Sequence, residues 1–145
     1  MTKDEMRKVG REGEEIARLF INQKIKPNIL LQMDWGFKKN GEWYSVEVKH
    51  QERYVKWKDS DIEGHGLPPW QVRARMELYK DKGIRCLFLV LEKGTGNIFW
   101  QWLDVLENKK YIETRNNPRR IYEISGFVKS KLKHSEGCFF MQKMG

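Results

Sequence analysis

The stretch MDWGFKKNGEWYSVEVK, residues 33–49, decides how this chain folds. Apolar residues alternate with polar ones on both sides of its central pair, Asn40-Gly41. Asn-Gly is the preferred pair for a two-residue type I′ turn, because both turn positions need a positive φ. The stretch therefore predicts a β-hairpin with Asn40 and Gly41 at its tip, and this turn fixes which residues face each other across the two strands.

The two faces of the predicted hairpin differ in character. One face carries the opposed apolar pairs Phe37–Tyr44, Trp35–Val46 and Met33–Val48. Because side chains alternate between faces, the other face places Asp34 opposite Glu47, with Lys49 two residues farther along. The Cβ atoms of such neighbours lie roughly 4.5–5.5 Å apart, and like charges directly opposite each other destabilise a sheet. A divalent cation bound by both carboxylates would offset this repulsion.

Asp34, Glu47 and Lys49 together predict a magnesium-dependent phosphodiesterase site. Mg²⁺ takes oxygen ligands in octahedral geometry and keeps several waters, so the two carboxylates supply one edge of its shell and the carbonyl of Val48 can supply another ligand. The Lys49 ammonium can orient or help to deprotonate the attacking water, and it can balance charge on the phosphoryl oxygens. The alternative is an ordinary exposed hairpin face.

Residues 2–23 carry apolar residues at helical spacing and end shortly before a proline, which predicts the first helix. Gly10 and Gly13 weaken its first half, since each costs roughly 1 kcal/mol relative to Ala. Either another backbone approaches closely at these glycines, or the helix begins near Glu12. A carboxylate of this helix, Glu14 or Glu12, would complete the metal shell or hold a second ion.

The chain after the hairpin predicts a helix between strands. Pro68-Pro69 begins a helix of about 13 residues that ends before Gly83. Ile84 to Leu91 is a nearly continuous apolar run, typical of a central strand covered on both faces, and residues 98–103 predict a further strand. A right-handed crossover follows from the strand, helix, strand order. The helix is expected to pack through Trp70, Ala74, Met76 and Leu78. Its other face, which would then point toward water or phosphate, carries Arg73, Arg75 and Lys80.

A polar, glycine-containing segment over residues 50–67 predicts a long loop, and loops of this length in compact domains are usually functional or disordered. Aromatic and basic residues alternate in it, a pattern that suits contact with sugar-phosphate and bases. The alternative is a loop that is merely solvated. The residues predicted to contact nucleic acid are Arg53, Lys56, Trp57 and Lys58 of this segment, together with Gln71 and Arg73 of the following helix.

Composition predicts one soluble domain spanning residues 1–145. The chain is 33% charged, and no apolar run approaches the roughly 18 residues of a membrane span. Its first residues lack the apolar core of a signal peptide, so we expect a cytoplasmic protein, or a phage-encoded one that acts in the host cytoplasm. The net charge of +8 is typical of nucleic-acid binders. Most of it lies in a basic C-terminal segment, residues 109–145.

These residues resemble the PD-(D/E)XK nuclease superfamily, and most closely its archaeal-type and phage Holliday junction resolvases. The resemblance covers roughly residues 8–103, and it rests on Glu14, Asp34 and Glu47-Val48-Lys49 in the order helix, hairpin, helix, strand. Gly13-Glu14-Glu15-Ile16-Ala17 matches a common Gly-Glu-x-x-Ala start of such nucleases, whereas helical phasing favours Glu12 as the inward carboxylate. Met33 stands where the motif name has proline, a position that often varies in the superfamily.

The resemblance implies a restriction-endonuclease-like αβββαβ core, which is an α/β fold with a mixed central sheet flanked by helices. It implies that Asp34 and Glu47 bind Mg²⁺ with a contribution from Glu14, that Mn²⁺ can substitute, and that Lys49 is the catalytic lysine. Gln71 corresponds to a helix glutamine that many members place near the site.

The expected function is therefore a Mg²⁺-dependent DNA endonuclease that is structure-selective, as a Holliday junction resolvase is, and leaves 5′-phosphate ends. The expected partner is branched DNA, and a homodimer is implied because a four-way junction must be cut on two strands symmetrically. Two alternatives remain at this point. One is a restriction-like or repair nuclease acting on linear duplex, and the other is a non-catalytic nucleic-acid-binding module with the same fold.

Overall fold

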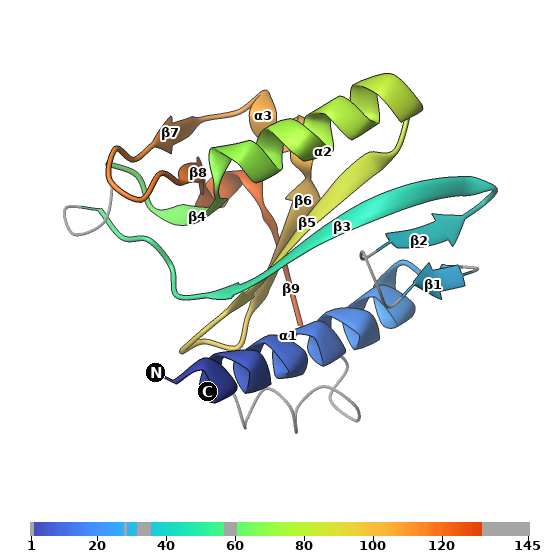
Figure 1. Ribbon diagram of the computed structural model, residues 1–145, viewed down its shortest axis with the longest axis horizontal. Coiled ribbons are helices and arrows are strands. Elements are labelled where there is room, and N and C mark those ends of the chain that lie inside the picture. Colours follow the sequence, from blue (N-terminus) through green and yellow to red (C-terminus); the bar gives the residue numbers. More distant parts are fainter. Residues whose placement is uncertain (1, 28, 32–35, 57–60, 132–145) are drawn as a thin grey trace.

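A mixed six-stranded sheet between two long helices forms the body of the protein (Figure 1). The computed structural model describes residues 2–27, 29–31, 36–56 and 61–131. The helices are α1 (Lys3–Lys24), α2 (Pro69–Lys82), α3 (Leu103–Glu107) and the 3₁₀ turn η1 (Ile124–Gly126). The strands are β1 (Ile29–Leu31), β2 (Gly36–Lys39), β3 (Glu42–Gln51), β4 (Gly64–Leu67), β5 (Arg85–Glu92), β6 (Ile98–Trp102), β7 (Tyr111–Glu113), β8 (Arg120–Glu123) and β9 (Val128–Ser130).

The central sheet has the strand order β1-β2-β3-β5-β6-β9. Strands β3 and β5 run parallel, with α2 in the connection between them, and every other neighbouring pair is antiparallel. A second sheet, of order β4-β8-β7, lies on the α2 side of the molecule (Figure 1). The predicted α/β fold, with a mixed central sheet flanked by helices, is therefore confirmed. The second sheet was not predicted.

The β2–β3 hairpin has the predicted turn and register. Asn40 and Gly41 have φ values of 52° and 82°, the positive angles that a type I′ turn needs. Phe37 pairs with Tyr44, and their rings stack with centroids 5.0 Å apart. The described ladder ends where Gly36 pairs with Ser45. The predicted pairs Trp35–Val46, Asp34–Glu47 and Met33–Val48 involve residues 32–35, which lie outside the described residues.

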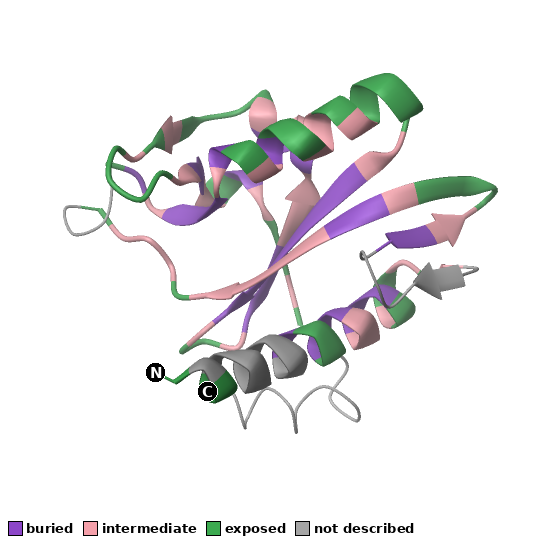
Figure 2. Ribbon diagram, in the orientation of Figure 1, coloured by how far each residue is buried: buried purple, intermediate pink, exposed green. Residues whose placement is uncertain are grey.

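Each face of the central sheet has its own apolar core (Figure 2). Strand β5 is buried along almost its whole length, as predicted for a central strand. Burial of each large side chain in these cores stabilises the fold by about 1.5–3 kcal/mol. The core under α1 includes Ile16, Phe20, Val46, Leu87 and Leu89. The core on the other face joins both sheets to α2 and α3 through Val72, Phe88, Val90, Leu106 and Tyr122.

Helix α2 has the predicted ends but a different buried face. It begins at Pro69 and ends before a glycine in the left-handed conformation, with φ 69°. The predicted packed stripe is wrong at Trp70, which is 62% exposed, and at Ala74, which is exposed. Val72 is buried instead, and Met76 packs against the same core. The rotation of the helix follows from the shape of the core it covers, which the helix sequence alone does not contain.

Helix α1 begins at Lys3, so the alternative of a start near Glu12 is wrong. Thr2 caps the helix, because its side-chain oxygen accepts a hydrogen bond from the backbone N–H of Glu5 (3.1 Å). The prediction that another backbone approaches these glycines is wrong at Gly13, where the close neighbour is a side chain. A Cβ atom there would lie 3.3 Å from the Cβ of His50, so a side chain of β3, rather than a backbone, occupies the space.

The prediction of a loop over residues 50–67 is wrong at both ends. Strand β3 continues to Gln51, and β4 occupies the last four residues of the range. Tyr54 and Gly64 exchange two backbone hydrogen bonds of 3.0 Å, which bring the two ends of the segment together. The sequence of β4, Gly-His-Gly-Leu, has little β propensity. Its pairing with β8, far along the chain, therefore makes it a strand.

Gly64 is expected to tolerate no side chain, because a Cβ atom there would lie 1.8 Å from the carbonyl oxygen of Tyr122 on β8. Gly64→Ala should lower the free energy of unfolding by about 1–3 kcal/mol or more, measured by urea denaturation. The control is Gly126→Ala, whose new methyl would meet the flexible end of Leu106 at 3.1 Å. Equal losses in the two variants would contradict the close packing of β4 on β8.

Candidate active site

Glu47 and Lys49 lie on the face of β3 that α2 covers. Val46 and Val48 belong to the core under α1, and side chains alternate along a strand, so the residues between them point to the opposite face. The contact of Glu47 with Arg75 of α2 agrees with this placement. The structure therefore brings the carboxylate and the ammonium group to one side of the sheet, two residues apart, as the sequence predicted.

The Glu47 carboxylate is held by Arg75. The Nε and Nη2 atoms of Arg75 both donate to Oε1 of Glu47, at 3.0 and 2.8 Å. The two side chains are only 17% and 23% exposed, so the pair is partly shielded from water and such charge-assisted bonds fix its geometry. Within the described part of the chain, Oε2 of Glu47 accepts no hydrogen bond. Arg75 thus positions Glu47 through one of its two carboxylate oxygens.

Lys49 is half-buried among charged side chains. Burial lowers the pKa of its ammonium group, the Glu47 carboxylate raises it, and the guanidinium groups of Arg119 and Arg75 lower it further. The pKa of Lys49 consequently lies below its ordinary value. Among the described residues, no side chain or carbonyl accepts a hydrogen bond from Nζ of Lys49. The charge of Glu47 acts on the Lys49 ammonium group, but the two side chains form no hydrogen bond with each other.

Gln71 adds a polar group with an open hydrogen-bonding position. It lies one helical turn before Arg75, so the two side chains share a face of α2. The amide oxygen of Gln71 is buried and has no hydrogen-bond partner among the described residues. Leaving such a group unpaired costs about 1–3 kcal/mol. Gln71 is therefore an unsatisfied polar group on the helix that also carries Arg75.

The predicted acidic residues of the metal site are placed unequally. Glu14 is exposed on α1, which covers the sheet face opposite to Glu47, so the described structure does not bring these two carboxylates together. Asp34 and the side chain of Glu12 lie outside the described residues. Val48 packs its side chain toward α1. Among the residues that the structure describes, no group of three His, Cys, Asp or Glu side chains could hold a metal ion.

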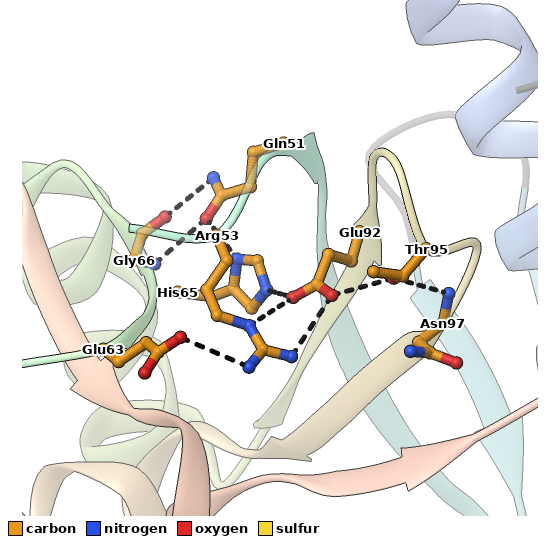
Figure 3. A network of polar contacts seen from close by, with 8 residues as sticks. All are labelled: Gln51, Arg53, Glu63, His65, Gly66, Glu92, Thr95 and Asn97. Carbon is orange, nitrogen blue, oxygen red and sulfur yellow. Dashed lines mark hydrogen bonds and ion pairs between the residues drawn. The ribbon is translucent and has the colours of Figure 1, made fainter. Parts of the chain in front are cut away.

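Arg53, predicted to contact nucleic acid, belongs to a buried polar network (Figure 3). Its guanidinium donates to both carboxylate oxygens of Glu92, at 2.8 and 3.2 Å. It also forms a longer ion pair with Glu63, at 3.6 Å, and lies 5.3 Å from the ring centroid of Phe99. These contacts give Arg53 a structural role, and its contact with nucleic acid stays a prediction.

The same network joins the two sheets. Glu92, at the end of β5, also accepts a hydrogen bond from Thr95 (2.8 Å) and lies 2.6 Å from Nε2 of the fully buried His65 on β4. The side-chain amide of Gln51, at the end of β3, exchanges two hydrogen bonds of 3.1 Å with the backbone of Gly66 (Figure 3). The ends of β3 and β5 are in this way tied to β4, which precedes α2.

Glu92 should make stability depend on pH. Burial raises the pKa of Glu92, but the hydrogen bonds from Arg53, Thr95 and His65 together outweigh burial and hold the pKa below its ordinary value. A carboxyl group whose pKa is lower in the folded state contributes stability that is fully present above the unfolded pKa and is lost as pH falls through the folded pKa.

We therefore expect the free energy of unfolding, measured in urea at a series of pH values, to decrease as pH falls below about 4.5. Glu92→Gln should remove part of this decrease, because glutamine does not titrate. Glu63→Gln, which removes an exposed carboxylate near the same Arg53, is the control. If Glu92→Gln and the wild type lost stability in parallel, Glu92 would not carry the pH dependence.

The structure describes two of the remaining predicted contacts to nucleic acid, Lys56 and Arg73. Lys56 is exposed, and Trp57 and Lys58 lie outside the described residues. Arg73 is exposed on α2 and lines a surface hollow of about 460 Å³ together with Trp70 and Arg119. The positive charge of Arg119, which lines this hollow, is one of the charges that lower the pKa of Lys49.

Three residues near the site have roles that the sequence did not indicate. Arg75 was assigned to water or phosphate, although its spacing of four from Gln71 could have placed both side chains on one helix face. Trp70 was assigned to the core and is exposed. Arg119 comes from the turn before β8, and nothing in the sequence places that turn beside β3.

Comparisons of this chain with protein-family models, with curated proteins and with solved structures gave no significant match. Among the helices that the structure describes, none is long and apolar enough to cross a membrane. The resemblance to the PD-(D/E)XK superfamily accordingly rests on the motif residues and their order in the chain.

Proposed function

We propose that this protein is a Mg²⁺-dependent DNA endonuclease with its active site on the α2 face of β3, and that it is structure-selective on branched DNA, as a Holliday junction resolvase is. The observation that carries the proposal is the placement of Glu47 and Lys49. Both are partly buried on one side of β3, and Arg75 binds Glu47 through one of its two carboxylate oxygens.

The order of elements supports the proposal. A helix, three antiparallel strands, a helix and a strand parallel to the third follow one another as α1, β1, β2, β3, α2 and β5. The αβββαβ core implied by the resemblance has the same order, with β4 inserted here before α2. Glu47 and Lys49 lie on β3, the third strand in this order, and β5 is the parallel neighbour of that strand.

The donor set fits a magnesium ion in part. Glu47 offers an oxygen, Asp34 would offer a second carboxylate, and the carbonyl of Val48 a third ligand. When bound, Mg²⁺ polarises the phosphodiester and lowers the pKa of a coordinated water. Mn²⁺ would bind the same oxygens. Glu14 would contribute only to a site with ligands from both faces of the sheet, because α1 covers the face opposite to Glu47.

The protein residues then have distinct roles in hydrolysis. Arg75 holds Glu47 in position, and Lys49 orients the attacking water and balances the charge that develops on the phosphoryl oxygens. Water attacks phosphorus, the bond between phosphorus and the 3′ oxygen breaks, and the products are a 5′-phosphate and a 3′-hydroxyl. Gln71, one helical turn before Arg75, has an amide oxygen without a partner among the described residues, and we assign it no step in the reaction.

The net charge of +8 supports an anionic polymer as substrate. Cutting a four-way junction symmetrically requires two active sites, which favours a homodimer. A nuclease acting on linear duplex would use the same residues, and a non-catalytic binding module with this fold would not need a carboxylate and an ammonium group facing phosphate.

The deciding experiment incubates the purified protein with a labelled four-way junction and with a matched linear duplex, each with Mg²⁺ and with EDTA, alongside Asp34→Asn. Metal-dependent, paired nicking of the junction alone supports a resolvase. Cutting of the linear duplex at an equal rate supports the duplex nuclease. Salt-sensitive binding without cutting under any condition would overturn the catalytic proposal in favour of the binding module.

A further inference from the structure

A surface hollow of about 460 Å³ lies between the start of α2 and the turn that joins β7 to β8. Pro68 and Trp70 line it from the helix side, and Asn117 and Arg119 from the turn side, with Arg73 on the next turn of the helix. The hollow is thus built from two segments that are far apart in the sequence. The helix that lines one side of the hollow, α2, also carries Gln71 and Arg75 of the candidate active site.

Trp70 is the aromatic surface of this hollow. Its side chain is 62% exposed, the highest value among the large hydrophobic residues that the structure describes as exposed. An indole ring in water loses the stabilisation that burial would give it. A nucleic-acid base would cover the ring, since every base has a flat face that stacks on an aromatic side chain.

The turn opposite Trp70 is held in a fixed shape. The guanidinium of Arg119 donates to the side-chain oxygen of Asn117 (3.2 Å) and to the carbonyl of Pro118 (2.8 Å). The backbone N–H of Arg119 donates to the hydroxyl of Thr114 (2.9 Å), and the backbone N–H of Thr114 donates to the carbonyl of Arg119 (3.0 Å). The position of the Arg119 charge is therefore set before any ligand arrives.

The hollow carries an excess of positive charge. Arg73 and Arg119 form no ion pair with an acidic residue of the described part of the chain. Glu113 also lines the hollow, and its carboxylate shares the guanidinium of Arg120 with Glu107. The positive charges of Arg73 and Arg119 therefore outnumber the negative charge of Glu113 in the wall of the hollow. Two guanidinium groups beside an open aromatic ring fit a ligand that has a flat apolar part and a phosphate.

The hollow and the candidate active site share helix α2. Trp70 and Arg73 line the hollow, and Arg75, two residues beyond Arg73, binds Glu47. The positive charge of Arg119, on the opposite wall of the hollow, also lowers the pKa of Lys49.

We propose that this hollow binds an unpaired nucleotide next to the scissile phosphate, with its base stacked on Trp70 and its phosphates bound by Arg73 and Arg119. The inference rests on the proposed function, because it takes the neighbouring site to act on nucleic acid. It deepens that function by naming single-stranded DNA, as found at branch points and flaps, as the part of the substrate that the protein recognises directly. Paired bases cannot stack on Trp70 without leaving the duplex.

The test measures the affinity of the chain of residues 1–145 for a fluorescein-labelled oligothymidylate, for a matched duplex and for polyglutamate, by anisotropy in EDTA so that no cleavage occurs. Trp70→Ala should weaken oligothymidylate binding by roughly 10- to 100-fold and duplex binding much less. Trp70→Phe, which keeps an aromatic face, should restore most of the affinity. Trp43→Ala removes another exposed tryptophan, on β3, and is the matched control.

A 2-aminopurine base in the oligonucleotide reports stacking directly, and its fluorescence should be quenched by the wild type and by Trp70→Phe but not by Trp70→Ala. Unchanged oligothymidylate affinity in Trp70→Ala, or a Trp70-dependent preference for polyglutamate, would overturn the inference even if the protein cleaves DNA. Trp70-dependent binding of oligothymidylate without cleavage in Mg²⁺ would support the inference and overturn the catalytic proposal.

Discussion

Lys49→Met and Glu47→Gln are each expected to reduce Mg²⁺-dependent DNA cleavage by roughly 10²- to 10³-fold, the loss typical of removing one group that stabilises the transition state. Lys49→Met removes the charge that balances the phosphoryl oxygens. Glu47→Gln removes the negative charge that would bind the metal ion, including the carboxylate oxygen that Arg75 does not hold. Single-turnover cleavage of labelled DNA at saturating protein measures the chemical step in both variants.

The control for this prediction is Glu42→Gln, which changes an exposed carboxylate on the same strand, on the other face of the sheet. Thermal unfolding must accompany the kinetics, because Glu47→Gln leaves Arg75 without its counter-ion while Lys49→Met removes a half-buried charge. If folded Glu47→Gln or Lys49→Met cleaved DNA as fast as Glu42→Gln, these residues would not form the active site.

Glu92→Gln is expected to lower the free energy of unfolding by about 3 kcal/mol at neutral pH, because removing one partner of a buried ion pair leaves the other charge uncompensated. The Glu92 side chain is 2% exposed and accepts hydrogen bonds from Arg53 at 2.8 and 3.2 Å. A glutamine keeps the shape but turns an N–H group toward a cation. Urea denaturation at pH 7 measures the effect.

Glu63→Gln provides the matched comparison, since Glu63 pairs with the same guanidinium at 3.6 Å but is 44% exposed. An exposed pair of this kind is worth about 0–1 kcal/mol. We therefore expect Glu63→Gln to cost much less than Glu92→Gln. Similar losses in the two variants would show that the network of Figure 3 does not carry the link between the sheets.

The parts of the fold that follow from local chemistry could be predicted from the sequence. Asn40-Gly41 sets the β2–β3 turn and register, because few residue pairs adopt positive φ at both positions. A proline at the start and a glycine after the end define α2. The period of two along β3 places Glu47 and Lys49 on one face.

Features that depend on distant parts of the chain could not be predicted. β4 is a strand because β8 pairs with it, not because Gly-His-Gly-Leu favours extended structure. The rotation that buries Val72 and exposes Trp70 is set by a core shared with α3 and the second sheet. Arg119 reaches the site from a turn that no local pattern connects to β3.

The most direct test of the metal-dependent active site is the binding of Mn²⁺ to the protein, measured by the electron paramagnetic resonance signal of the free ion. The account predicts that the wild type and Glu42→Gln bind at least one Mn²⁺ per chain, that Mg²⁺ displaces it, and that Glu47→Gln and Asp34→Asn each lose it. Absence of binding by the wild type, or undiminished binding by both carboxylate variants, would contradict the assignment of Glu47 and Asp34 to a metal site.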